Sequence, residues 1–233
     1  MEYIREHFES VASTNDYAKS KRADNKNRIV TADFQSGGRG TKGRAFSSNA
    51  GGVYLTKVDF YDDFPAKDAF KVMSNTAVAV CETLRFYGVQ PVIKWANDIH
   101  VNGKKICGIL IENTFSGNRV ACSVVGVGLN VCNALPSELT DIAITLEQAT
   151  GQRFAVSEVR EKLIEQLCKA HPFAKYLGYI GYMGERVELV FADKTVSATL
   201  LSVDETGGLW VEIDGERVRV TAGEVSLRTG RSV

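Results

Sequence analysis

The chain has 233 residues, 44% of them hydrophobic, and its 28 basic side chains balance 28 acidic ones. This composition indicates a globular protein with a full hydrophobic core and excludes a largely disordered chain. Zero net charge argues against a protein that binds DNA or an anionic membrane through bulk charge, so we expect neither as a partner.

The first part of the chain alternates helix and strand signals. Several N-cap residues follow Val11, and a loop rich in Gly, Ser and basic side chains spans residues 35–49. Pro65 precedes apolar residues at three- and four-residue steps, which predict a helix packed on a sheet. We expect a helix over 13–23, strands over 28–34 and 53–60, and a helix over 66–87.

The centre is rich in strands, and two turn signals, at 102–103 and 116–118, predict hairpins there. The expected strands are 92–95, 98–101, 105–113 and 119–131. Helices are expected over 141–149 and 157–177, with Pro172 kinking or splitting the second.

After Gly184 short strands are separated by glycine-containing turn pairs, which predicts a small five-strand barrel. The expected strands are 187–191, 194–203, 209–213, 217–221 and 225–228. Residues 184–233 hold 6 basic and 9 acidic side chains (net −3), whereas residues 1–183 hold 22 and 19 (net +3). We therefore place a domain boundary near residue 183.

Five scattered cysteines without a CxxC pair predict free thiols in a reducing compartment. The charged N-terminus has no signal-peptide pattern, and no apolar stretch reaches 18 residues. We therefore expect a cytoplasmic protein.

The loop from Gly37 to Arg44 is the most informative local segment. It lies in a stretch, Gln35 to Ser48, with three basic side chains and no acidic one. Glycines let backbone N–H groups approach phosphate oxygens, and arginine adds a planar donor fork, so the loop predicts an anion site. A flexible surface loop is the alternative. Its GxGxxG match does not indicate a dinucleotide fold, because a strand rather than a helix follows.

Three further segments hold candidate residues. Lys94 to Asp98 places a cation, an indole, an amide and a carboxylate between two strands, where ordinary turn formation is the alternative. Lys105 begins the next strand, where an ordinary solvated lysine is the alternative. Gly126 to Asn130 ends a buried strand, and its glycines indicate close approach of a ligand or, as the alternative, close packing. The three histidines have no metal-ligand spacing.

In this order and spacing, these segments resemble the biotin protein ligase family. The matching segments are 13–15, 35–46, 94–98, 101–110, 126–130 and 223–228. The resemblance implies an α+β fold: a mixed β-sheet catalytic domain flanked by helices over 1–183, of the biotin/lipoate ligase type, and an SH3-like β-barrel over 184–233. It also implies two reactions. Biotin and MgATP give biotinyl-5′-adenylate and pyrophosphate, and a lysine of a biotin carboxyl carrier domain of a biotin-dependent carboxylase then takes the biotinyl group.

The resemblance further implies the roles of single residues. The catalytic residues would be Lys105, Arg39 and Asp98. Biotin would be bound by Ser13, Thr14, Asn15, Gln35, Gly38, Arg39, Gly40, Lys105 and Gly108. ATP would be bound by Arg39, Arg44, Phe46, Lys94, Trp95, Asn97, Asn130, Glu224 and Arg228. Asn97 and Asp98 would hold Mg²⁺.

Three positions depart from the family pattern. Thr41 stands where many members have a second arginine, so we expect the adenylate to escape faster than from a Thr41→Arg variant. Phe46 replaces a tryptophan and keeps an aromatic face. Ala96 replaces a proline and changes little beyond turn rigidity.

The resemblance leaves several alternatives. No helix-turn-helix segment precedes Ser13, so we expect a ligase alone, without DNA binding; whether it forms a homodimer stays open. A lipoate or octanoate protein ligase or transferase shares the fold, although the chain has no RRxSGGG loop. A non-catalytic module that binds a nucleotide or a carrier is the alternative of another class.

Overall fold

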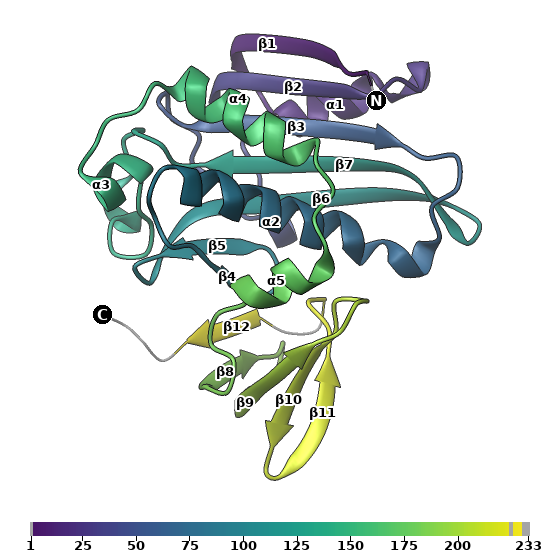
Figure 1. Cartoon of the computed structure of the whole chain (residues 1–233), viewed down its shortest axis with the longest axis vertical. Helices are drawn as coiled ribbons and strands as arrows, with labels where there is room; N and C mark the ends of the chain where they lie inside the picture. The colour runs from purple at the N-terminus through teal and green to yellow at the C-terminus, as the bar shows by residue number, and fades with distance from the viewer. Residues whose placement is uncertain (1, 224–225, 230–233) are drawn as a thin grey trace.

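The computed structural model describes residues 2–223 and 226–229, and the first part of the chain forms a seven-stranded sheet (Figure 1). Its order is β1-β2-β3-β7-β6-β5-β4. Only β1 and β2 pair in parallel, so the sheet is mixed, as predicted. The strands are β1 (Ile4–Val11), β2 (Arg28–Gln35), β3 (Val53–Phe60), β4 (Val92–Lys94), β5 (Asp98–Val101), β6 (Lys104–Ser116) and β7 (Arg119–Leu129).

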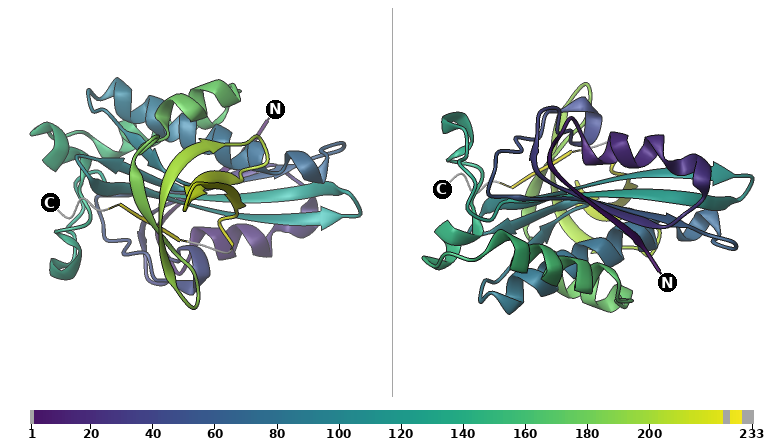
Figure 2. Two further views of the ribbon diagram at one scale, coloured as in Figure 1. Left: turned by 90° about the horizontal axis from the view of Figure 1, so that it is seen from below. Right: turned by 90° about the horizontal axis from the view of Figure 1, so that it is seen from above.

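Helices cover both faces of this sheet. Helix α1 lies on one face, and α2 and α4 lie on the other (Figure 2). Helix α5 packs beside α2 and leads into the C-terminal part. The helices are α1 (Thr14–Ser20), α2 (Phe70–Phe86), α3 (Leu146–Thr150), α4 (Val156–Leu167) and α5 (Phe173–Tyr179).

Local signals explain most element ends. Helix α1 begins where Ser13 Oγ accepts a hydrogen bond from the backbone of Asp16 at 3.3 Å. Asn102 and Gly103 have φ values of 51° and 76°, the positive values that a two-residue hairpin turn requires. Pro172 caps α5, so the predicted 157–177 helix is split there.

Two elements differ from the prediction. Strand β1 was not predicted, because its side chains are exposed or half-exposed at the sheet edge and show no buried apolar alternation. The helix expected over 141–149 begins only at Leu146, where Thr145 and Gln148 form a capping box.

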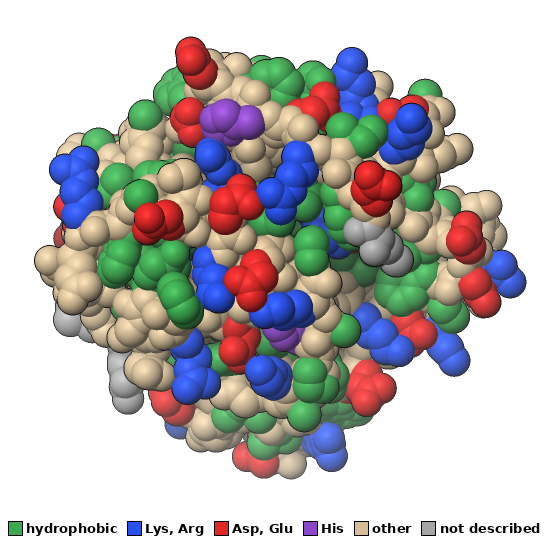
Figure 3. All heavy atoms as spheres, turned by 45° about the horizontal axis from the view of Figure 1, so that its top comes forward, with side chains coloured by type: hydrophobic (Ala, Val, Ile, Leu, Met, Phe, Trp, Pro, Cys, Tyr) green, Lys and Arg blue, Asp and Glu red, His purple; other side chains and the backbone are tan. Residues whose placement is uncertain are grey.

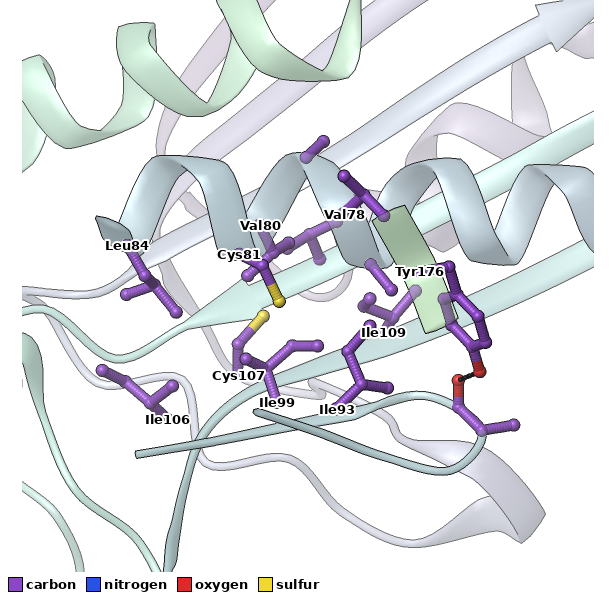
Figure 4. Close-up of a cluster of buried hydrophobic side chains, with 14 of the residues drawn as sticks. Val78, Val80, Cys81, Leu84, Ile93, Ile99, Ile106, Cys107, Ile109 and Tyr176 are labelled. Carbon is purple, nitrogen blue, oxygen red and sulfur yellow. Dashed lines mark hydrogen bonds between the residues drawn. The ribbon is translucent and has the colours of Figure 1, made fainter. Parts of the chain in front are cut away.

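The core lies between α2 and the sheet (Figure 4). Apolar side chains of α2 pack against β4, β5 and β6, and the thiols of Cys81 and Cys107 point toward each other. All five cysteines are free. Burial raises the pKa of the Cys81 thiol and of the Cys107 thiol, so both stay protonated and unreactive.

The C-terminal part is a five-stranded antiparallel sheet in the order β11-β10-β9-β8-β12. No pairing joins β11 to β12 in the described residues, so the hydrogen bonding of this sheet does not close. The strands are β8 (Arg186–Val190), β9 (Thr195–Val203), β10 (Leu209–Ile213), β11 (Glu216–Val220) and β12 (Ser226–Thr229). The boundary at residue 183, shortly before β8, stays a prediction.

Helix α5 and the turn between β9 and β10 hold the segment between β4 and β5 in place. The indole N–H of Trp95 donates to the carbonyl of Gly207 at 3.1 Å. Tyr176 OH donates to the carbonyl of Ala96 at 3.2 Å (Figure 4). A Cβ on Gly207 would lie 2.3 Å from the Phe70 ring, so the turn fits against α2 only with glycine. Core residues of both sheets form one continuous hydrophobic cluster.

Basic and acidic side chains are interspersed on the face that Figure 3 shows, which agrees with the balanced charge of the sequence. None of the helices in the described part of the chain is both long and apolar enough to cross a membrane.

Candidate ligand-binding site

A cavity of about 440 Å³ lies on the α1 side of the sheet, between α1, the 35–49 loop and strands β6 and β7. Most residues predicted for the site line it: Ser13, Thr14, Asn15, Gln35, Arg39, Gly40, Arg44, Phe46, Lys94, Asn97, Asp98, Lys105, Gly108 and Asn130. Their individual roles stay predictions. Glu224 and the side chain of Arg228 lie outside the described residues.

Gly38 and Trp95 do not line the cavity. A Cβ on Gly38 would lie 2.4 Å from Ser48 Oγ and 2.5 Å from the carbonyl oxygen of Phe46, so this glycine serves the folding of the loop itself. Trp95 is buried, and its N–H donates to Gly207. These contacts give both residues a packing role, and the ligand contacts expected of them stay predictions.

One end of the cavity is polar and buried. The backbone N–H of Thr14 donates to Gln35 Oε1 at 2.8 Å, which fixes the orientation of the Gln35 amide. The Thr14 hydroxyl lies 3.0 Å from the same oxygen and 2.8 Å from the Thr56 hydroxyl. Thr56 Oγ1 in turn lies 2.5 Å from Asn15 Oδ1. Thr56 lies on β3 and was not predicted as a site residue.

The side-chain oxygens of Gln35, Thr14, Thr56 and Asn15 form a row in which the hydroxyl hydrogens are fewer than the oxygen–oxygen contacts. Gln35 Oε1 and Asn15 Oδ1 only accept, and the hydroxyls of Thr14 and Thr56 supply two hydrogens for three oxygen–oxygen contacts. An oxygen in the row therefore stays ready to accept from an N–H group. The Ser13 hydroxyl complements it, because Ser13 Oγ accepts from Asp16 N and its hydrogen has no acceptor within the described residues.

The 35–49 loop is held by contacts of its own side chains. Arg39 pairs with Asp16 of α1, and this contact fastens the loop tip to the helix. Arg44 donates to Thr41 Oγ1 at 3.1 Å and to the Thr41 carbonyl at 3.3 Å. The departure at Thr41 thus has a structural consequence, because the Thr41 hydroxyl positions a guanidinium that lines the cavity.

Three glycines of the cavity floor make room for side chains. A Cβ on Gly128 would lie 2.5 Å from the Phe46 ring, and one on Gly126 would lie 2.4 Å from Asn15 Oδ1. The space over Gly108 is taken by Lys105 and Phe46, both at 3.2 Å from such a Cβ. Gly108 therefore leaves room for these two side chains, and the contact with biotin that the resemblance implies for it stays a prediction.

Charged groups gather at the other end. Lys105 Nζ lies 2.7 Å from Asp98 Oδ1, and Lys94 stands opposite Asp98 in the β4–β5 pairing. His100, which was not predicted, lines the same end opposite Lys105 in the β5–β6 register. Burial and then Lys94 lower the pKa of His100 to about 4, so its ring is neutral at pH 7. Its two-residue step from Asp98 along a strand is the signal that could have found it.

Asn97 is fixed to β6, and its side-chain oxygen Oδ1 accepts no hydrogen bond from the described residues. Its Nδ2 donates to the Ile109 carbonyl at 2.9 Å, and its own backbone carbonyl accepts from Ile109 N at 3.1 Å. The described part of the chain has no group of three or more His, Cys, Asp or Glu side chains that could hold a metal. A magnesium ion that is already bound to phosphate groups needs few protein ligands, and the Asp98 carboxylate and the Asn97 amide oxygen fit such an ion.

Apolar side chains that the sequence did not predict also line the cavity. They form an apolar rim, made of Leu135, Leu139, Ile142 and Ala143. The backbone of Lys105 binds this segment through Ile142 O at 2.8 Å and Ile144 N at 3.0 Å. Asn130, predicted as an ATP contact, is buried and donates to the Ile144 carbonyl at 3.3 Å, so it also holds the rim.

Fold and cavity together define a ligand-binding α+β protein with a polar end, a cationic end and a glycine- and arginine-bearing loop over its site. Residues 7–130 match the Biotin/lipoate A/B protein ligase family, and residues 182–228 match the Biotin protein ligase C terminal domain. The chain belongs to the biotin/lipoate A/B protein ligase family.

Named relatives agree with this assignment. The bifunctional ligase/repressor BirA of Bacillus subtilis is 30% identical over 85% of this chain, which spans 66% of that protein's length. The biotin--[acetyl-CoA-carboxylase] ligase of Mycobacterium tuberculosis is 27% identical over 84% of this chain and 77% of its own. The biotin protein ligase of Aquifex aeolicus, solved in complex with biotin and ATP, has a TM-score of 0.76 and 26% identity, over 96% of this chain and 98% of that one.

Proposed function

We propose that this chain is an ATP-dependent ligase that converts biotin to biotinyl-5′-adenylate and transfers the biotinyl group to a lysine of a biotin carboxyl carrier domain. The family assignment and the relatives named as biotin ligases support this reaction. The observation that carries the choice of biotin is the polar end of the cavity. It offers acceptor oxygens from Thr14 and Asn15, both in contact with the buried Thr56 hydroxyl, and a hydroxyl hydrogen from Ser13.

A ureido ring matches this end. Its N–H groups donate where the oxygen row lacks a hydrogen, and its carbonyl accepts from the Ser13 hydroxyl. A lipoyl dithiolane or an octanoyl chain has no such groups. Each buried polar group left without a partner costs about 1–3 kcal/mol, so the polar end disfavours lipoate and octanoate.

The reaction needs positive charge at the far end of the cavity. A biotin carboxylate oxygen attacks the α-phosphorus of ATP, and pyrophosphate leaves. Lys105, oriented by Asp98 at 2.7 Å, would offset the charge that develops on the reacting oxygens, with Arg39 and Arg44 from the loop. The neutral amine of the carrier lysine then attacks the acyl carbon, AMP leaves, and Asp98 is the nearby carboxylate that could take the released proton.

Magnesium would enter as MgATP. Asn97 and Asp98 are the residues that would hold it, and the ion would neutralise charge on the leaving pyrophosphate. Phe46 and the apolar rim offer flat and apolar surfaces for the adenine ring.

We place this reaction in the cytoplasm, where carrier domains of biotin-dependent carboxylases would be met and the five free thiols stay reduced. Neither DNA nor a membrane is a proposed partner. We keep residues 184–233 as a separate C-terminal domain in this proposal, and a homodimer stays open.

Measuring pyrophosphate release tests the proposal. Three separate reactions each contain MgATP and one acid, which is biotin, lipoate or octanoate. We expect release with biotin alone, and a loss of at least about 100-fold in Lys105→Met, because one charged contact to the reacting oxygens disappears. Lys169→Met, which removes an exposed lysine on the other side of the sheet, is the matched control. Release with lipoate or octanoate and not with biotin would contradict the proposal.

A further inference from the structure

A carboxylate beyond the cavity lining controls the orientation of an amide inside it. Glu112 lies on β6, two residues after Leu110, which lines the cavity. Its Oε2 accepts from Asn15 Nδ2 at 3.3 Å, and its Oε1 accepts from Lys19 Nζ at 2.8 Å.

The chemistry of these groups permits one orientation of Asn15. A carboxylate only accepts, so the amide nitrogen of Asn15 must face Glu112. Asn15 Oδ1 must then face Thr56, 2.5 Å away, and add an acceptor to the oxygen row. Asn15 is 6% exposed, and its side chain lies directly over Gly126, so the amide has little contact with bulk solvent.

Lys19 forms an ion pair with this carboxylate, in which Lys19 Nζ lies 2.8 Å from Glu112 Oε1. Burial acts to lower the pKa of Lys19, but hydrogen bonds with Glu112 and Asp16 outweigh it and raise the pKa. The ammonium therefore stays charged near pH 7 and balances Glu112. It also lies 3.1 Å from Asp16, the residue that holds Arg39.

We propose that Glu112 is a positioning residue that holds the Asn15 amide oxygen toward the ligand and so sets the preference of the polar end for a head group with N–H donors. This inference rests on the proposed function, in which biotin is that ligand. Glu112 touches neither the cavity nor the reacting atoms, and it acts through Asn15.

The first test is Glu112→Gln, which keeps the size of the side chain. Glutamine can both donate and accept, so the Asn15 amide is no longer held in one orientation. We expect the KM for biotin to rise about tenfold, while the KM for ATP and kcat change less than about twofold. Glu161→Gln, which removes an exposed ion pair on α4 far from the cavity lining, is the control and should leave all three unchanged.

A pair of substitutions separates positioning from a general structural role. Asn15→Asp alone sets two carboxylates against each other and should raise the KM for biotin about 100-fold. In Asn15→Asp combined with Glu112→Gln, the glutamine N–H donates to one oxygen of the new carboxylate, and the other oxygen of that carboxylate faces Thr56. We expect this double variant to recover about tenfold of the loss.

The inference would be overturned if the KM for biotin does not change in Glu112→Gln. It would also be overturned if the increase in this KM in the double variant equals the product of the increases in the two single variants. A parallel rise in the KM for ATP together with a lower Tm would also overturn it, because that pattern indicates a structural role. If the wild-type chain releases no pyrophosphate with biotin, the proposed function itself fails, and the inference falls with it.

Discussion

At the scale of single residues, the site depends on glycines that let particular side chains lie close to the sheet. Gly126 and Gly128 leave room for Asn15 and Phe46, and a methyl group at either position would overlap them. The side chains above the glycines, in turn, carry the hydrogen-bonding groups and the aromatic surface of the cavity.

Gly126→Ala should therefore displace Asn15, whose Oδ1 lies 2.4 Å from where the new methyl group would be. We expect the KM for biotin to rise at least about tenfold, with a matching loss of affinity, since the displaced amide loses its fixed hydrogen bonds. Gly178→Ala is the control, because a Cβ there meets nothing within 4 Å and the residue lies in α5. Isothermal titration calorimetry measures the affinity of both variants for biotin. Equal affinities of Gly126→Ala and Gly178→Ala would contradict the role given to Gly126.

Sequence patterns located the residues that belong to contiguous motifs, such as Ser13 to Asn15 and Lys105. They did not locate Thr56, Glu112 or His100. Thr56 and Glu112 contact side chains of α1, and His100 lies opposite Lys105 on the neighbouring strand. A single sequence does not define the packing or the strand register that brings such residues together.

At the scale of elements, every described strand except β1 was expected within a few residues of its place, because turn pairs and apolar runs mark strands on their own. The turn at 204–208 shows what such reasoning misses. It was predicted only as a glycine turn, yet the Gly207 carbonyl accepts from Trp95, which follows β4 of the seven-stranded sheet, and Asp204 organises the turn. That long-range contact has no local signature.

The Asp204 carboxylate makes the stability of this element depend on pH. Hydrogen bonding to Arg219, aided by Thr206 and Gly208, lowers the pKa of Asp204 below its ordinary value of 3.8, and burial opposes the shift only in part. The stabilisation is therefore present above pH 4 and is lost as the pH falls below it.

We expect the unfolding free energy of the native chain to fall between pH 7 and pH 3 by about 1 kcal/mol more than that of Asp204→Asn. Urea unfolding at the two pH values measures this difference. The asparagine variant should also be less stable at pH 7, because the charged hydrogen bonds to Arg219 are weakened. Identical pH dependence in both proteins would refute this role of Asp204.

At the scale of the whole molecule, the two sheets share one hydrophobic cluster, and a hydrogen bond from the Trp95 indole to the Gly207 carbonyl links the two parts of the chain. A shared core favours cooperative unfolding over independent melting of two parts. The contact also supports the site, because Trp95 directly follows Lys94, which lines the cavity.

We therefore expect one thermal transition. Tryptophan fluorescence, which reports on Trp95 beside the contact and Trp210 in the C-terminal sheet, should give the same Tm as far-UV circular dichroism. Two separated transitions would mean that the shared cluster does not couple the sheets.

Competition between acids within one reaction tests the central claim most directly. The protein is incubated with MgATP, equal amounts of biotin, lipoate and octanoate, and both a biotin carboxyl carrier domain and a lipoyl domain. Mass spectrometry then identifies each modified acceptor. The account predicts one biotinyl group on a single lysine of the carrier domain and no change to the lipoyl domain. A lipoyl or octanoyl group on either acceptor, without biotinylation, would contradict it.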